Sequence, residues 1–264
     1  MPTRDSAWPQ GTPCWVDCSV DDPQAARDFY SRLLGWEIPD GSDESGGYMI
    51  ALLNGRAAAG IGPKMGTGPM PSVWTTYIAA TDVDATAEAV GAAGGTVFAP
   101  PMDVMDVGRM AVAADPTGGI FGIWQAKAHT GAGIFNEPGA YCWNELHTPG
   151  YTTAQEFYRR VFEWTYDEIG DGQNFVYSTF SAPGTDVLGG MMDSAHIPGE
   201  EPPNWLTWFQ VAGADAALDR ARELGATIMM GPNDSPFGRM GVVQAPQGEV
   251  FGLIDTTVRA APPA

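Results

Sequence analysis

The chain has 264 residues, of which 44% are hydrophobic, and a formal net charge of −19 at pH 7. A surface this acidic repels nucleic acids and anionic membranes, which excludes both as expected partners. No stretch approaches the roughly 20 apolar residues of a membrane-spanning helix, and the beginning of the chain lacks the apolar segment of a signal peptide. We therefore expect a soluble, cytoplasmic protein, present as a monomer or a homodimer.

The sequence repeats itself at a spacing of about 130 residues. The repeated pairs are Trp15 and Trp143, Phe29-Tyr30 and Phe157-Tyr158, Trp36 and Trp164, Gly108-Arg109-Met110 and Gly238-Arg239-Met240, and Phe121-Gly122 and Phe251-Gly252. This period is too long for a solenoid, whose units run to about 20–50 residues. It indicates two homologous domains, and each half of the chain is large enough to bury its own core.

In the first half, the pattern predicts a strand at 14–18 and a helix at 22–34. Asp22 is the expected N-cap of this helix, Pro23 lies in its first turn, and Gly35 ends it. The elements that follow are strands at 47–53 and 57–62, a strand at 74–80, a helix that begins near Val83 and ends before Gly94, and two strands that flank the turn at 115–118.

The second half repeats this order. Thr153 and Glu156 form an expected capping box for a helix at 153–163. After it come a strand at 205–211, a helix at 215–224 and a turn at 246–248. Each half thus reads as two βαβββ modules. The expected domains are residues 1–127 and 139–264, joined by a linker at 128–138 that is rich in glycine.

These elements and motifs resemble the vicinal oxygen chelate superfamily of glyoxalases, extradiol dioxygenases and bleomycin-resistance proteins. The residues that carry the resemblance are Phe29-Tyr30, Gly35-Trp36, Asp82-Val83-Asp84, Gly108-Arg109-Met110, Asp115-Pro-Thr-Gly118 and Phe121-Gly122. More closely, the chain resembles a two-domain glyoxalase-like group from actinobacteria, often labelled hydroxylases or secreted antigens. The resemblance covers residues 11–256. It implies an α+β fold in which four βαβββ modules form two tandem domains, each an eight-stranded open cup.

In that family a divalent metal lies in the cup, and the resemblance implies ligands from the first strand, the fifth strand and the last strand of each domain. Carried over by position, these are Asp17, Thr75 and Gly122 in the first half, and Glu145, Leu206 and Gly252 in the second half. Glycine and leucine side chains cannot donate to a metal. We therefore expect no metal in either cup and no other cofactor.

Strand alternation predicts what lies in each cup instead, because residues two apart face the same side. Arg109 and Arg239 begin their strands on the face opposite Met110 and Met240, so we expect each to point a guanidinium into its cup. The expected substrate-binding residues are Trp15, Asp17, Tyr77, Arg109, Trp124, Trp143, Leu206, Trp208 and Arg239. Such a set suits a small aromatic or polycyclic ligand, although aromatic residues also serve as ordinary core.

The two halves differ most in their first strands. Only the second places a carboxylate and an imidazole two residues apart, at Glu145 and His147. Such a pair can share a proton, which makes these two residues the expected catalytic groups. The alternative is a partly exposed histidine at a strand end beside a structural glutamate. His129 in the linker and His196 in the loop 193–204 are expected to be solvated, although either loop could fold over the mouth of a cup.

Three function classes follow. The first is a metal-independent glyoxalase-like enzyme, with lyase, isomerase or hydrolase chemistry on an aromatic or polycyclic molecule in secondary metabolism. The second is a protein of the bleomycin-resistance type, which sequesters its ligand without catalysis. The third is a protein interaction or antigen-like role. No P-loop and no G-x-G-x-x-G motif after a strand points to a nucleotide instead.

Overall fold

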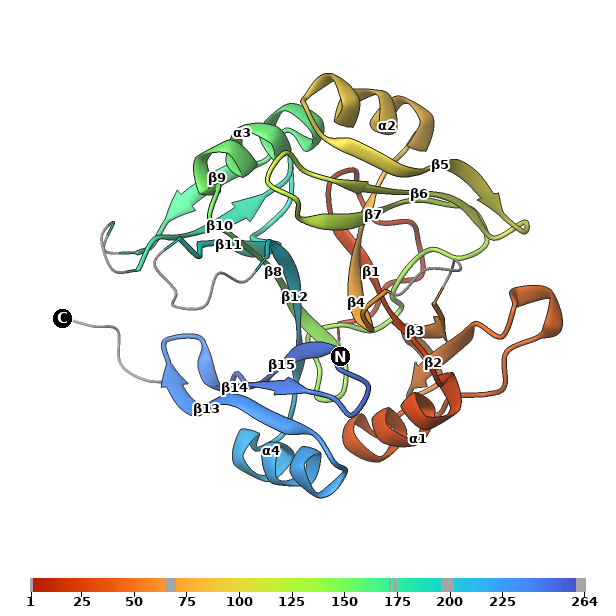
Figure 1. Cartoon of the computed structure of the whole chain (residues 1–264), viewed down its shortest axis with the longest axis vertical. Coiled ribbons are helices and arrows are strands. Elements are labelled where there is room, and N and C mark those ends of the chain that lie inside the picture. Colours follow the sequence, from red (N-terminus) through yellow and green to blue (C-terminus); the bar gives the residue numbers. More distant parts are fainter. Residues whose placement is uncertain (1, 65–69, 171, 173–174, 196–201, 260–264) are drawn as a thin grey trace.

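The computed structural model describes residues 2–64, 70–170, 172, 175–195 and 202–259. They form an α+β fold of two tandem domains, each built on one curved mixed sheet (Figure 1). The first domain contains β1 (Pro13–Val20), α1 (Pro23–Leu34), a 3-10 turn (Asp43–Ser45), β2 (Met49–Leu53), β3 (Arg56–Pro63), β4 (Val73–Ala79), α2 (Val83–Ala92), β5 (Thr96–Val104), β6 (Gly108–Ala114) and β7 (Ile120–Ala126).

The second domain repeats these elements. It contains β8 (Tyr141–Thr148), α3 (Tyr151–Phe162), β9 (Thr165–Glu168), β10 (Tyr177–Ser181), β11 (Gly189–Asp193), β12 (Asn204–Gln210), α4 (Ala214–Glu223), β13 (Thr227–Ser235), β14 (Gly238–Gln244) and β15 (Val250–Asp255). The strand orders are β2-β3-β1-β4-β7-β6-β5 and β13-β14-β15-β12-β8-β11-β10-β9. In both sheets the first strands of the two modules are antiparallel neighbours at the centre.

The first sheet has seven strands, so the prediction of eight strands for each cup holds only for the second. There, β9 extends the sheet by pairing with β10. The equivalent segment of the first domain makes a single bridge, between Glu37 and Leu52. Pro39 follows closely, and because proline has no backbone N–H it cannot continue the ladder.

Helix starts show one correct and one incorrect prediction. The Asp22 side chain caps α1 by accepting from the N–H groups of Gln24 and Ala25, and Gly35 ends the helix in the left-handed conformation. The predicted capping box of the second domain is wrong. α3 begins at Tyr151, and its N-cap residue, Gly150, makes no side-chain cap. The turn after β8 is short, so the helix has already begun when the chain reaches Thr153.

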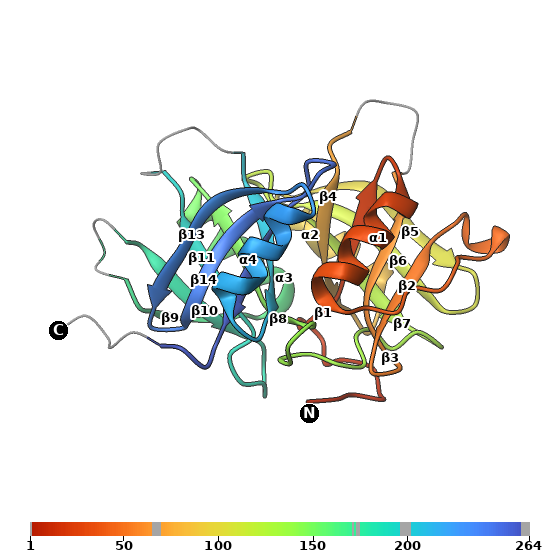
Figure 2. The same cartoon turned by 90° about the horizontal axis from the view of Figure 1, so that it is seen from below.

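The first helix of each domain packs against the other domain. Tyr30 on α1 donates to the buried carboxylate of Glu249, at 2.9 Å, just before β15. Tyr158 on α3 donates to the buried Asp115, at 3.0 Å, just after β6. α1 therefore contacts α4, and α2 contacts α3, so the helices form two pairs at opposite ends of the molecule (Figures 1 and 2).

The two sheets meet back to back at the centre of the molecule. Thr76 on β4 and Thr207 on β12 both donate to the Oδ1 atom of Asn144 on β8, at 2.9 and 3.2 Å. The concave faces of the sheets consequently point away from each other, to opposite sides in Figure 1. We call them the N-terminal cup and the C-terminal cup.

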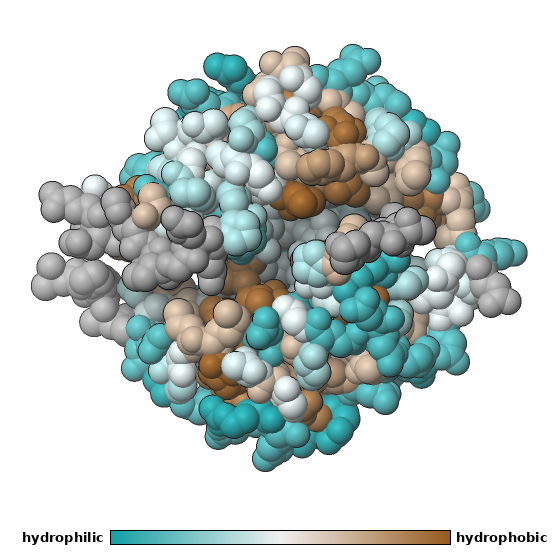
Figure 3. Space-filling model, viewed as in Figure 1, coloured by the Kyte–Doolittle hydropathy of each residue, from teal (hydrophilic) through white to brown (hydrophobic). Residues whose placement is uncertain are grey.

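The surface agrees with the acidic composition. In Figure 3, hydrophilic residues cover much of the rim, while hydrophobic ones gather in the upper part and near the centre of that face. No helix in the described part of the chain is long and apolar enough to cross a membrane.

Candidate functional site

Strand register brings the predicted cup residues of each domain onto one face. In the first domain, Trp15 pairs with Tyr77 across β1 and β4, and Tyr77 pairs with Gly122 on β7. In the second, Trp143 pairs with Trp208 across β8 and β12. Residues that pair directly share a face of the sheet. Each cup is thus lined by aromatic rings around one carboxylate, Asp17 or Glu145.

A continuous chain of hydrogen bonds crosses the C-terminal cup. The Trp143 indole donates to the hydroxyl of Tyr177, at 2.9 Å, and this hydroxyl donates to Oε2 of Glu145, at 2.7 Å. The other carboxylate oxygen of Glu145 makes a short hydrogen bond with Nε2 of His147. The Glu145 and His147 side chains keep 12% and 16% of their surface exposed, so neither is fully buried.

The environment of Glu145 favours its charged form. Burial acts to raise the pKa of the carboxyl, but the interaction with His147 and the hydrogen bond from Tyr177 outweigh it, and the pKa is lowered. Glu145 is therefore a carboxylate at neutral pH that anchors the imidazole, and not a stored proton donor. Apolar side chains of Leu206, Trp208 and Ile254, all buried, form the wall beside this pair.

The N-terminal cup has the same chain of hydrogen bonds, but the pKa of its carboxyl group is shifted in the opposite direction. The Trp15 indole donates to Tyr48, at 2.9 Å, and Tyr48 donates to Asp17, at 3.2 Å. Burial raises the pKa of Asp17 to about 7, although the hydroxyls of Tyr77 and Tyr48 oppose it. Ser19 occupies the strand position equivalent to His147, so no imidazole on the strand keeps this carboxyl charged.

Sequence reasoning missed Tyr48 and Tyr177, which join the tryptophan to the carboxylate in each cup. Tyr48 precedes β2 and Tyr177 begins β10, and each of these strands is separated from the first strand of its domain by one other strand, β3 or β11. One signal was available in the sequence: the two tyrosines are separated by nearly the same spacing as the other repeated residues.

Glycines make room for the aromatic rings. A Cβ atom on Gly60 or Gly190 would overlap the hydroxyl of Tyr48 or Tyr177. Gly122 and Gly252 occupy equivalent positions on the last strand of each domain. A Cβ atom on Gly122 would overlap the ring of Tyr77, and a Cβ atom on Gly252 would overlap the ring of Trp208. These last two glycines stand where the resemblance places a metal ligand, so an aromatic ring covers each of those positions.

The residues at the implied metal positions do not fit a divalent cation. Each cup offers one carboxylate, and the remaining positions hold Thr75 and Gly122, or Leu206 and Gly252. In the described part of the chain, no group of three or more histidine, cysteine, aspartate or glutamate residues is arranged to hold a metal ion. A hard cation needs several such donors converging on one point.

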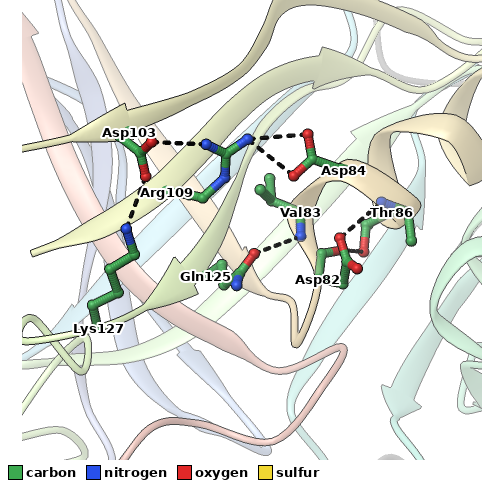
Figure 4. Close-up of polar contacts among 9 residues, drawn as sticks. Asp82, Val83, Asp84, Thr86, Asp103, Arg109, Gln125 and Lys127 are labelled. Atoms are coloured by element: carbon green, nitrogen blue, oxygen red, sulfur yellow. Dashed lines mark hydrogen bonds and ion pairs between the residues drawn. The ribbon is translucent and has the colours of Figure 1, made fainter. Parts of the chain in front are cut away.

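The two arginines predicted to enter the cups lie on the opposite face. Arg109 forms ion pairs with Asp84 on α2 and Asp103 on β5, both at 2.9 Å (Figure 4). Arg239 pairs in the same way with Asp215 on α4 and Asp234 on β13. The prediction that the arginines and the methionines lie on opposite faces of these strands is confirmed, but the methionines face the cups and the arginines do not.

The helices decide which face of these strands is outside. Ala111 and Ile123 share the face of Arg109 and pack in the core under α2, whereas Met110 pairs with Trp124 on the cup side. A guanidinium at the strand end reaches the first turn of the helix, where aspartate is favoured by the helix dipole. Both arginines therefore tie a helix to its sheet.

His129 differs from the expectation of a solvated linker residue. Its ring lies in the N-terminal cup, in contact with the rings of Trp15 and Trp124. His196 lies outside the described residues.

Replacing Gly252 with alanine is expected to lower the free energy of unfolding by about 2–3 kcal/mol, because the rigid indole of Trp208 must move. Gly122→Ala should act in the same direction against Tyr77. Gly91, exposed on α2 with open space around its Cβ position, supplies the control, since Gly91→Ala should stabilise the protein by up to about 1 kcal/mol. Urea denaturation measures all three. A Gly252→Ala protein as stable as the wild type would contradict the packing described here.

Comparison with known proteins agrees with the two-domain architecture. The family model described as Glyoxalase/Bleomycin resistance protein/Dioxygenase superfamily matches residues 15–121 and 142–253. A Mycobacterium tuberculosis protein named "Putative glyoxylase CFP32" is 42% identical over 261 residues, which is 96% of this chain and 98% of that protein. The Anthracycline biosynthesis protein DauV of a Streptomyces species is 35% identical over 273 residues, 96% of each chain.

Solved structures share the fold. The Mn(II)-bound glyoxalase from Novosphingobium aromaticivorans superposes with a TM-score of 0.63 at 19% identity, over 97% of this chain and 89% of that one. The 2,3-dioxygenase LapB from Pseudomonas superposes with a TM-score of 0.65 at 14% identity, over 96% and 95%. At these identities the likeness concerns the fold alone.

Proposed function

Because this chain belongs to the Glyoxalase/Bleomycin resistance protein/Dioxygenase superfamily, we propose that it is a metal-independent enzyme acting by acid–base chemistry on an aromatic or polycyclic small molecule. The reaction takes place in the C-terminal cup. The observation that carries the proposal is the chain from Tyr177 through Glu145 to His147, which ends at two partly exposed groups beside aromatic walls.

His147 is the proposed group that exchanges a proton with the ligand. Glu145 holds Nε2 of the ring, which fixes its orientation and leaves Nδ1 of the neutral imidazole as proton acceptor. Nδ1 takes a proton from an acidic C–H or O–H group of the ligand, and the imidazolium remains paired with the carboxylate. The ring then returns the proton to another atom, which gives an isomerisation, or allows a leaving group to depart.

The walls of the cup support a flat ligand. Trp143 and Trp208 pair directly across β8 and β12, two positions along the strands from Glu145, and Phe175 and Phe237 extend the aromatic surface outward from Tyr177, with ring centroids 5.5 and 6.4 Å away. Both phenylalanines are 43% exposed, so their rings are available for contact with a flat ligand.

Two further observations support the finer points of the proposal. Metal independence is supported by the donor set, since Leu206 and Gly252 complete no coordination sphere with Glu145. A role in secondary metabolism is supported by the relative named for anthracycline biosynthesis.

The alternative is a binding protein that sequesters its ligand without catalysis. It is favoured by the tryptophan–tyrosine–carboxylate chain that recurs in both cups, since an aromatic cup alone suffices for binding. Sequestration does not require the imidazole of His147, which lies on β8, whereas the equivalent strand of the first domain, β1, has Ser19 at this position.

Hydrogen–deuterium exchange separates the two functions. The probe is 2-tetralone, a fused-ring ketone with acidic C–H groups beside its carbonyl, incubated with the protein in D2O and followed by proton NMR. An acid–base enzyme should accelerate loss of those C–H signals well above the buffer rate. Binding of the ketone, detected by saturation transfer, without faster exchange would favour sequestration instead.

A further inference from the structure

The linker inserts a histidine into the N-terminal cup. The His129 ring meets Trp15 edge to face at a centroid distance of 4.4 Å, and Trp124 at 5.4 Å. Its backbone is held from two directions, because its N–H donates to Val107, at 2.9 Å, and its carbonyl accepts from the Trp124 indole, at 3.0 Å. The imidazole is therefore a fixed part of the cup and not a passing loop side chain.

One atom of this ring is without a partner. Nε2 of His129 is buried and makes no hydrogen bond with any described residue. A buried polar group left unsatisfied costs about 1–3 kcal/mol, so native proteins nearly always supply a partner, from the protein, water or a ligand. Burial also lowers the pKa of His129 to about 4, so that the ring is an uncharged hydrogen-bonding group at neutral pH.

Polar groups suited to an uncharged ligand lie around the same aromatic wall. The Trp15 ring that contacts His129 also donates its N–H to Tyr48, which in turn donates to Asp17. Val112 faces the cup beside Gly122 and is half-buried, so the concave face is accessible at this position. Thr130, which follows His129 in the linker, and Trp124 both line a hollow of about 170 Å³.

We propose that the N-terminal cup is a second ligand site, for an uncharged aromatic molecule that carries a hydroxyl group. The ring of the ligand packs against Trp15 and Trp124, and its hydroxyl donates a hydrogen bond to Nε2 of His129. The site is independent of the chemistry proposed for the C-terminal cup, which uses His147. An anionic ligand is disfavoured in the N-terminal cup, because the cup carries the carboxyl group of Asp17, which is partly charged at neutral pH.

The test follows histidine ring nitrogens by NMR, because the chain has only three histidines. Uniformly 15N-labelled protein is titrated at pH 7 with 2-naphthol, a neutral fused-ring phenol. We expect the Nε2 signal of His129 to move as the probe saturates the N-terminal cup. The anion 2-naphthoate, of similar size, should leave that signal in place.

Matched variants from the repeat assign the response to one cup. Trp15→Ala should weaken the His129 response at least tenfold, while Trp143→Ala, at the equivalent position of the C-terminal cup, should leave it unchanged. Trp15→Phe, which keeps a ring, serves if the alanine variant does not fold. The proposal is overturned if His129 does not move up to the highest soluble concentration of 2-naphthol. It is equally overturned if Trp143→Ala abolishes the response. Neither result bears on exchange catalysed at His147.

Discussion

Replacing Glu145 with glutamine should lower the rate of proton exchange or turnover at least about 100-fold, while the affinity for the ligand changes little. Glutamine has nearly the same shape and can still accept from Tyr177, but it carries no charge to stabilise an imidazolium at His147. His147→Ala should have an effect of at least the same size, because it removes the group that accepts the proton. Rates are compared at saturating ligand, and affinities by titration of the unreactive complex.

Ser19 provides the control for this prediction. It occupies the position of His147 in the first repeat, so Ser19→Ala makes a comparable change on the equivalent strand of the other cup. We expect its rate to stay within about threefold of the wild type. Unchanged turnover of the true substrate in both Glu145→Gln and His147→Ala would show that the pair is structural, and the sequestration function would then take precedence.

Replacing Asp17 with asparagine should change how stability depends on pH. The folded protein raises the pKa of this carboxyl from 3.8 to about 7, so between these values the folded state binds the proton more tightly than the unfolded chain. Stability from this group is therefore present at low pH and is lost as pH rises toward and through 7. The difference between the two pKa values corresponds to roughly 4 kcal/mol.

Denaturation by urea at pH 5 and pH 8 measures this effect. Compared with the wild type, Asp17→Asn should lose less stability between the two pH values, and at pH 8 it should be the more stable protein. Glu145→Gln is the matched contrast, because the pKa of Glu145 is lowered and its contribution is lost on acidification instead. Parallel pH dependence of Asp17→Asn and wild type would contradict the raised pKa.

Several features could be read directly from the residues. The repeat of tryptophans and Gly-Arg-Met motifs predicted two similar domains, which the two family-model matches bear out. The first strand also placed Glu145 and His147 on one side, because alternation along a strand is a local property. In the same way, Asp22 and Gly35 marked the ends of α1, since caps act within a few residues.

Other features depended on packing between distant segments. Alternation shows which residues share a face but not which face is concave, and α2 and α4 decided that Arg109 and Arg239 lie outside the cups. Tyr48 and Tyr177 reach the carboxylates only because β3 and β11 pair with the first strand of each domain, and β2 and β10 pair with β3 and β11 in turn.

The tertiary structure also decided the pKa shifts of the two cup carboxyl groups and the position of His129 in the linker. The sequence by itself determined the repeat, the local helix ends and the presence of one carboxylate on the first strand of each half. It could not determine that Asp17 and Glu145 have shifts of opposite direction, because a pKa depends on burial and on neighbours supplied by other elements. Nor could it place His129 between two tryptophans, since a linker without periodicity takes its position from the strands that it joins.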